Sequence, residues 1–398
     1  MQTTATINAL QRYAAVTAPF TVRGVRFRNR VFLSAMGLDM AESDGCMSPD
    51  LIEFYRGVIA GGVGAVMLSN ASVSRESALL PRALKMHDSR HAAALRPFFD
   101  EAAQANVVVG VQLQHYGGQG ATTLTSGHPL LTPSGIGCQS SLKLDPNYRV
   151  RAMEAEDFDR VQAEFAQGAR LAVAAGARFV QLQASNGYLL SSFLSKFTNR
   201  REDDWGGDPL RRARFVIEVV EAVRAAIGPE VVLGLRIGLN DYLGAGGLEL
   251  ADLEPVVPRL EAAGVDLFEA SFCVADTFSR LSQNTPELRA ELAAQVRQFR
   301  EWASVPVGFA GFIGSLQESC DLIEAGVVDY VALARALLAD NDLIRKELAG
   351  RESEVHRCRW DGACFRDKYN PQFQRVHCCV NPKYKRPSDG AKQLEGAI

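Results

Sequence analysis

Short, almost continuously apolar segments recur along the chain, and amphipathic segments lie between them. Each apolar segment is rich in Val, Leu or Phe, which is typical of a strand buried on both faces of a parallel sheet. The predicted strands are Val31–Ser34, Ala65–Ser69, Val107–Gln112, Phe179–Gln183, Val232–Arg236, Leu267–Ala270, Val307–Ala310 and Tyr330–Ala334.

The intervening segments place Ala, Leu, Val and Arg at helical spacing, most clearly in Phe158–Ala175 and Pro209–Ile227. Pro209 suits the first turn of a helix, where its missing N–H would have no partner in any case. The other predicted helices are Pro49–Ala60, His91–Ala105, Asp252–Ala263, Glu287–Trp302, Leu316–Ala325 and Leu343–Leu348.

Strands that alternate with helices in this way predict an α/β fold of the (β/α)8 TIM-barrel type, with an open doubly wound sheet as the alternative. We favour the barrel because polar residues stand at the C-terminal ends of most strands, which form the active-site face of a barrel. We expect the barrel over residues 1–350 and a Cys-bearing tail over residues 351–398. The long segment Gly117–Arg149 is predicted to be an irregular loop over the mouth of the site.

The charge of the chain is nearly balanced, with 43 Lys and Arg against 46 Asp and Glu and a net charge of −3. We therefore expect no nucleic-acid partner, because such proteins need a basic surface. No apolar run approaches the roughly 18 residues of a membrane span, and Met1–Phe20 lacks the pattern of a signal peptide. We expect a cytoplasmic protein with a small-molecule substrate and no membrane contact, and leave assembly into a homo-oligomer open.

Glycines and an arginine follow the last two predicted strands. Gly311, Phe312 and Gly314 come after the seventh strand, and Ala334 and Arg335 end the eighth. Barrels often bind phosphate there through backbone N–H groups, and an Arg adds charge-assisted hydrogen bonds. A tight turn beside a solvated Arg is the alternative, but the two halves together favour a phosphate site.

Polar side chains also interrupt two other strands at their C-terminal ends. Gln112 ends the third strand and Arg236 ends the fifth. An amide can bind the hydrogen-bonding edge of a planar heterocycle, and an Arg can stabilise negative charge that develops on a ring. The alternative is an internal Gln–Arg pair that only satisfies the top of the barrel.

Two amides and a phenol follow the fourth strand within six residues: Gln183, Asn186 and Tyr188. Amides can bind and polarise a carbonyl oxygen, and a phenol can donate a proton. A polar loop with a structural Tyr is the alternative interpretation.

Taken together, these residues resemble the old yellow enzyme family of flavin-dependent ene-reductases, in order from about Phe20 to about Gly350. The Trp-Gly-Gly-Asp form and the tail are most similar to the branch that contains 2,4-dienoyl-CoA reductase and trimethylamine dehydrogenase. The matching motifs are Asn29-Arg30-Val31, Ser34-Ala35-Met36, Gly61-Gly62-Val63-Gly64, Gln112-Leu113-Gln114-His115, Asn186-Gly187-Tyr188-Leu189, Phe193-Leu194, the long Asn199–Gly207, Arg236, the Gly311 loop and Ala334-Arg335.

The resemblance implies FMN, bound without a covalent link on the C-terminal face of the barrel. Gln112 would contact the pyrimidine edge of the flavin and Arg236 would lie near its N1–O2 region. The phosphate would be held by Gly311, Phe312, Ala334 and Arg335, and Ala35, Met36, Gly37 and Asn70 would lie along or near the ring.

The resemblance also implies the reaction. Hydride would pass from NADH or NADPH through the flavin to the β-carbon of an activated alkene. Tyr188 would supply the proton to the α-carbon, while Gln183 and Asn186 would hold the electron-withdrawing oxygen of the substrate.

The chain departs from the family pattern in three places. Gln183 stands where many members have a His, and an amide cannot become cationic. Gly37 stands where others have Thr or Cys near the flavin. The segment after the sixth strand, residues 271–276, contains no His, so the acid relay of dienoyl-CoA reductase is not expected.

Cysteines of the tail are close to the spacing of the branch's iron–sulfur motif. Cys358, Cys364 and Cys378 match that spacing, but Asp361 replaces one expected thiolate, and clusters favour four thiolates. The chain also ends before any FAD- and NAD-binding module that would reduce a cluster. A metal-free tail is therefore favoured over a bound cluster.

The sequence thus predicts an FMN-dependent ene-reductase that uses NADH or NADPH. A flavin-dependent amine dehydrogenase or demethylase on the same barrel is the alternative reaction. A barrel that binds a phosphate-bearing ligand without catalysis is the alternative of another class, since fold alone does not establish activity. An RNA-modifying flavin barrel is disfavoured by the net charge.

Overall fold

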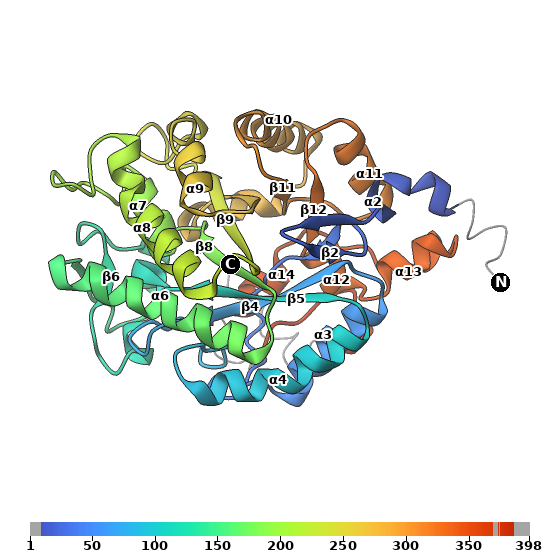
Figure 1. The fold of residues 1–398 in the computed structure, drawn as a ribbon, viewed down its shortest axis with the longest axis horizontal. Coiled ribbons are helices and arrows are strands. Elements are labelled where there is room, and N and C mark those ends of the chain that lie inside the picture. Colours follow the sequence, from blue (N-terminus) through green and yellow to red (C-terminus); the bar gives the residue numbers. More distant parts are fainter. Residues whose placement is uncertain (1–8, 369–372, 374, 386–398) are drawn as a thin grey trace.

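The computed structural model describes residues 9–368, 373 and 375–385. Eight parallel strands close into a barrel in the order β10-β11-β12-β3-β4-β5-β8-β9, and helices surround it (Figure 1). The predicted TIM barrel is confirmed. Its strands are β3 (Val31–Leu33), β4 (Ala65–Ser72), β5 (Val108–Gln114), β8 (Phe179–Ala184), β9 (Val232–Asn240), β10 (Leu267–Phe272), β11 (Val307–Phe309) and β12 (Tyr330–Leu333).

Five of the helices between the strands, α3, α4, α8, α10 and α11, begin at a polar residue whose side chain caps the first turn. In α8, Asp208 accepts hydrogen bonds from the backbone N–H groups of Leu210 and Arg211, and Pro209 occupies the first turn. The outer helices are α3 (Pro49–Ala60), α4 (Ser89–Gln104), α6 (Ala155–Ala175), α8 (Pro209–Ile227), α9 (Val257–Ala263), α10 (Pro286–Trp302), α11 (Leu316–Glu324), α12 (Arg335–Ala339) and α13 (Leu343–Leu348).

One predicted helix is shorter than the sequence suggests. Instead of a continuous Asp252–Ala263, a 3-10 turn, η3 (Leu250–Leu253), is followed by α9. Pro255 and Pro258 account for the break, because a proline has no N–H to donate and is tolerated only near the start of a helix.

Five strands, β4, β5, β8, β9 and β10, run further toward the mouth of the barrel than predicted. Pairing between β4 and β5 continues to Ser72 opposite Gln114, past an irregularity between Leu68 and Ala71. Neighbouring strands satisfy the backbone there, so the ladder continues although the side chains have become polar.

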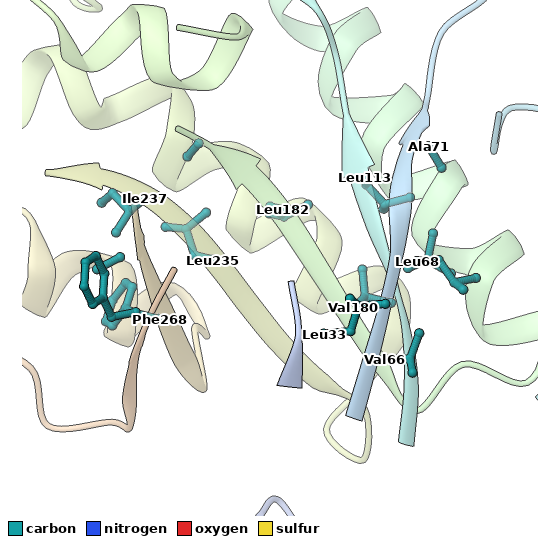
Figure 2. Packing of buried hydrophobic residues seen from close by; sticks show 14 of the residues in the cluster. Leu33, Val66, Leu68, Ala71, Leu113, Val180, Leu182, Leu235, Ile237 and Phe268 are labelled. Atoms are coloured by element: carbon teal, nitrogen blue, oxygen red, sulfur yellow. The ribbon is translucent and has the colours of Figure 1, made fainter. Parts of the chain in front are cut away.

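Alternate residues of each strand face opposite sides of the barrel wall. The outward set packs against the helices in the main core, as Figure 2 shows for Val66 and Leu68 on β4 and Val180 and Leu182 on β8. Full burial of one such side chain contributes about 1.5–3 kcal/mol.

The inward set changes character along the barrel axis. At the N-terminal end it is apolar and includes Phe32, Met67, Phe179, Leu267 and Tyr330. One layer further toward the C-terminal ends of the strands, the inward positions are polar. They are Ser34, Gln112, Gln181, Arg236 and Glu269. The upper half of the barrel interior is therefore polar, and it lies below the active-site face.

A hairpin that the sequence did not predict packs at the N-terminal end of the barrel. Its strands are β1 (Phe20–Val22) and β2 (Val25–Phe27), joined at Arg23 and Gly24, both with positive φ. The ring of Phe27 lies 4.8 Å from that of Phe32, which lies 4.6 Å from that of Tyr330. This aromatic stack joins the hairpin to the apolar half of the barrel.

The segment predicted as an irregular loop, Gly117–Arg149, carries short elements of its own. They are η1 (Gly117–Gln119), η2 (Thr122–Leu124), β6 (Leu130–Thr132) and α5 (Gln139–Leu144). Residues of β6 pair in parallel with β7 (Val150–Ala152). Short strands among Gly, Ser, Thr and Pro give little periodic signal, so only the contact between them defines this sheet.

None of the helices in the part of the chain that the structure describes is both long and apolar enough to span a bilayer.

Candidate active site

One cavity opens at the C-terminal ends of the barrel strands, with an empty volume of about 1190 Å³ including the part open to solvent. Twelve of the thirteen predicted cofactor, substrate and catalytic residues line it: Ala35, Met36, Gly37, Asn70, Gln112, Gln183, Asn186, Tyr188, Arg236, Gly311, Ala334 and Arg335.

The exception is Phe312, which is buried beneath the wall rather than lining it. Its ring lies 5.5 Å from the ring of Trp360, and the guanidinium of Arg335 lies 5.4 Å from it. Phe312 therefore supports Arg335, and only its backbone remains a candidate for phosphate contact.

A buried polar network forms the floor of the cavity. Gln112 donates to Gln181 Oε1 at 2.7 Å, Gln181 donates to Glu269 Oε2 at 3.2 Å, and Ser34 donates to Glu269 Oε1 at 2.6 Å. All four side chains are at most 2% exposed. The network orients the amide of Gln112 before any ligand binds.

Arg236 joins this network through a carboxylate. Its Nε lies 3.4 Å from Glu269 Oε1, and its Nη atoms donate to Ser34 Oγ, the Ala35 carbonyl and Ser271 Oγ at 3.1–3.2 Å. The Gln–Arg pair considered from the sequence is not formed directly, since the recorded hydrogen bonds of Gln112 and Arg236 go to other groups. Glu269 and Gln181 are the partners that the sequence analysis missed.

Asn186 holds the loop after β8 in a left-handed turn, with a φ of 60°. Its Nδ2 donates to the carbonyls of Phe272 and Cys273 at 3.0 and 3.2 Å, at the end of β10. The donors of this amide are thus engaged by backbone, and its observed role is to join two strand ends.

Gln183 is bound at one end of its amide and loosely held at the other. Its Oε1 accepts from Ser185 N at 3.0 Å and Ser185 Oγ at 2.6 Å. Its Nε2 donates to Gln112 Oε1 at 3.4 Å, which is a long hydrogen bond. The N–H groups of Gln183 are therefore better placed than those of Asn186 to turn toward a ligand.

Tyr188 ends the loop after β8 and stands immediately before α7 (Leu189–Leu194). Its ring packs edge-on against Tyr116 at 5.6 Å, and the Tyr116 hydroxyl accepts from Asn70 Nδ2 at 3.2 Å. The phenol is thus held by ring packing in the cavity wall.

Gln114 is a lining residue that the sequence analysis quoted only within a motif. It is 0% exposed, and neither Nε2 nor Oε1 has a hydrogen-bond partner among the described residues. A buried polar group without a partner costs about 1–3 kcal/mol. The signal was present in Val111-Gln112-Leu113-Gln114, because polar residues at alternate positions of a strand share one face.

The far end of the cavity carries a positive charge. Arg335 donates to the Leu281 carbonyl at 2.8 Å, stacks 4.7 Å from the Trp360 ring, and forms no ion pair within the described ranges. Burial lowers the pKa of the Arg335 guanidinium, and the opposing effect of Cys358, Cys364 and Asp361 is smaller. At Gly311 a Cβ would lie 2.0 Å from the Phe309 ring, so only glycine fits this turn.

The tail closes one side of the cavity. Cys364, Phe365 and Val376 line it, and the Phe365 ring stacks on Phe278 at 4.1 Å and 18°. Val376 N donates to the Leu38 carbonyl at 3.0 Å. The described part of the tail is therefore a wall of the active site, a role that the sequence alone did not indicate.

The cysteines of the tail lie in the same region as Arg335. Cys358, Cys364 and Asp361 oppose the lowering of the Arg335 pKa by burial, and the Cys379 thiol donates to Asp361 Oδ2 at 3.2 Å. Within residues 9–368, 373 and 375–385, no group of three or more His, Cys, Asp or Glu side chains is arranged to hold a metal ion. The chemistry of the cavity is therefore considered without an iron–sulfur cluster.

The residues present fit a flavin with a phosphate. An oriented amide at Gln112, a cation at Arg236, a side-chain-free turn at Gly311 and a second cation at Arg335 share one cavity. Among the described lining residues the charged ones are these two arginines, which suits an anionic ligand.

Comparison with known proteins agrees with this site. The family model for NADH:flavin oxidoreductases and NADH oxidases matches residues 16–354. An NADH oxidase of Thermoanaerobacter brockii is 27% identical over 89% of this chain, and an N,N-dimethylglycine/sarcosine dehydrogenase of Chromohalobacter salexigens is 30% identical over 96%. The chain spans about half the length of these relatives, 54% and 56%.

An NADPH dehydrogenase of a Geobacillus species is 29% identical over 81% of this chain and is covered over 90% of its own length. Among solved structures, 2-naphthoyl-CoA reductase superposes with a TM-score of 0.84 at 22% identity, over 94% of this chain and 57% of that one. That superposition bears on the fold. The family match covers most of the chain and includes every cavity residue up to Arg335, so this protein belongs to the NADH:flavin oxidoreductase / NADH oxidase family.

Proposed function

We propose that this protein is an FMN-dependent ene-reductase that uses NADH or NADPH to reduce an activated C=C bond. The observation that carries the proposal is the placement of a phenol, Tyr188, and an adaptable amide, Gln183, in the same cavity as the flavin-compatible Gln112 and Arg236. When bound, FMN supplies a ring that accepts a hydride from the nicotinamide and passes it to the alkene.

The protein's own residues supply orientation and the proton. Gln183 donates an N–H to the electron-withdrawing oxygen of the substrate, which polarises the double bond. Asn186 keeps the loop after β8 against β10, so that Gln183 and Tyr188 face each other across the substrate. Tyr188 Oη then gives its proton to the α-carbon.

Amine oxidation is the second candidate, because a relative at 30% identity is a dimethylglycine/sarcosine dehydrogenase. The cavity favours it less. A cationic amine would meet Arg236 and Arg335, and among the described residues no carboxylate lines the cavity to bind it.

The decisive experiment separates the two half-reactions. The anaerobic protein is reduced with NADH or NADPH, and its reoxidation by 2-cyclohexenone is followed by flavin absorbance. We expect Tyr188→Phe to slow reoxidation by about 10²–10⁴-fold, the usual cost of losing a general acid, and to leave reduction by nucleotide nearly unchanged.

Tyr13→Phe is the matched control, because Tyr13 is buried away from the cavity and its hydroxyl makes one long bond of 3.4 Å to Glu352. Both half-reactions of this variant should match the unmodified protein. Equal reoxidation rates for Tyr188→Phe and the unmodified protein would show that another group supplies the proton. Reduction of the oxidised flavin by sarcosine, together with no reoxidation by any alkene, would favour the amine reaction instead.

A further inference from the structure

Gln114 is the amide among the described lining residues that has both of its side-chain polar atoms buried without a hydrogen-bond partner. Its side chain is completely buried and lines the cavity, and both amide atoms lack a partner among the described residues. An amide in this state is complementary to a ligand that offers one acceptor and one donor.

Each neighbouring amide has at least one hydrogen-bond partner among the described residues, and Gln183 is the one whose N–H is held by a long bond that a ligand can replace. Asn70 donates to Tyr116, Gln119 donates to the Asn186 carbonyl, and Asn186 donates to the end of β10. Gln112 and Gln183 bond to each other and to the floor network. Gln114 therefore differs from the other described lining amides in offering both its N–H and its oxygen to a ligand.

Its position along β5 separates it from Gln112. Both residues face the cavity, and Gln114 is two residues nearer the mouth. A strand rises about 3.3 Å per residue, so the two positions are about 7 Å apart along it. A planar ring that contacts Gln112 leaves Gln114 to a second molecule on the mouth side, where a substrate would enter.

We propose that Gln114 is a specificity-determining residue that binds a neutral substrate through a carbonyl oxygen with an adjacent N–H, as in an unsaturated lactam or imide. Its Nε2 donates to the carbonyl and its Oε1 accepts from the N–H. The inference rests on the proposed function, since it names the class of alkene that this cavity prefers. A carboxylate would leave Oε1 unpaired, so a neutral group fits better.

The test uses two saturated lactams that bind without reacting, 2-piperidone and N-methyl-2-piperidone, which differ in the N–H. Their dissociation constants for the oxidised, FMN-loaded protein are measured from changes in the flavin absorbance. We expect the N–H lactam to bind about tenfold more tightly, as for the gain of about one hydrogen bond. In Gln114→Met, a variant of similar size, this preference should disappear.

Gln119→Met is the matched control, because it removes another glutamine of the same cavity and should leave the N–H preference in place. Stability is a second readout. Gln114→Met removes two unpaired buried atoms, so the melting temperature of the ligand-free protein should be unchanged or higher. A lower melting temperature, or loss of FMN from this variant, would overturn the proposal by assigning Gln114 to the fold or the cofactor.

The proposed function is tested separately by reoxidation with 2-cyclohexenone, which has no N–H. Alkene reduction without any lactam preference, or with a preference that survives in Gln114→Met, would overturn the role of Gln114 alone. A Gln114-dependent preference in a protein that no alkene reoxidises would overturn alkene reduction and retain the binding role.

Discussion

Glu269 sets how much positive charge Arg236 presents to the cavity. Its carboxylate lies 3.4 Å from Arg236 Nε and is otherwise bound by Ser34 and Gln181. Since Arg236 would stabilise negative charge on the reduced flavin, a buried carboxylate beside it weakens that effect. The residue therefore adjusts the reactivity of the site without lining the cavity.

This arrangement gives a prediction for the reduction potential. Glu269→Gln keeps the shape of the side chain and removes its charge, although one of its two acceptor oxygens becomes a donor, so the midpoint potential of the bound flavin should rise. We expect a rise of about 30 mV, which is tenfold in the equilibrium constant of a two-electron couple. Arg236→Leu should lower the potential and reduce the FMN content of the purified protein.

Glu101→Gln serves as the control for these measurements, because Glu101 pairs with Arg56 on the surface, away from the cavity. Potentials are measured by equilibration with redox dyes. Unchanged FMN content and an unchanged reduction rate in Arg236→Leu would remove Arg236 from the site.

At the scale of elements, the start of α6 depends on one buried carboxylate. Asp157 accepts from Glu154 N at 2.9 Å, Arg151 Nη2 at 2.8 Å and Arg160 Nη2 at 2.7 Å. Burial opposes its ionisation, but the hydrogen bonds from Arg151, the Glu154 backbone and Arg160 prevail and lower its pKa. This joins β7 to the helix that follows it.

The lowered pKa makes the contribution of Asp157 depend on pH. A carboxyl whose pKa falls on folding stabilises the protein above its unfolded value, near 3.8, and the effect is lost as the pH falls toward the folded value. Asp157→Asn should therefore lower the free energy of unfolding at pH 7 by about 1–3 kcal/mol, and the deficit should shrink below about pH 4.

Denaturant unfolding at pH 7 and pH 3.5 measures this difference. Asp159→Asn, on the exposed face of the same helix, should change the stability little at either pH. A deficit of equal size at both values would mean that Asp157 acts through its two acceptor oxygens and not through its charge.

At the scale of the whole molecule, the tail returns to the barrel and completes the cavity wall. Phe365 stacks on Phe278 and Val376 bonds to the segment after β3. Cys364 lines the cavity, and its thiol pKa is raised to about 11 by burial. Among the described residues, no group of three or more His, Cys, Asp or Glu side chains is arranged to hold a metal ion.

We therefore expect anaerobically purified protein to contain FMN and no stoichiometric iron or acid-labile sulfide. Iron is determined by elemental analysis against protein and flavin concentration. About four irons per chain, the content of a [4Fe–4S] cluster, would contradict this expectation, and Cys364→Ala should then abolish the iron.

The sequence by itself determined the barrel, the order of its strands and most of the cavity lining. Apolar runs of the length of buried strands identified the eight barrel strands. The residues at the ends of these strands, such as Gln112 and Arg236, therefore had to lie at one face of the barrel. Closure of a parallel barrel brings all C-terminal strand ends to one face, so distance along the chain does not matter.

Only the tertiary structure decided which partners those residues have. Gln181 lies opposite Gln112 and Glu269 lies opposite Arg236 on neighbouring strands, and these pairs depend on register. Asn186 is engaged by β10, while Gln114 is left without a partner. The tail joins the cavity wall through contacts between residues hundreds of positions apart, such as Val376 and Leu38. Local patterns carry no information on such contacts, because their energy comes from packing between distant segments.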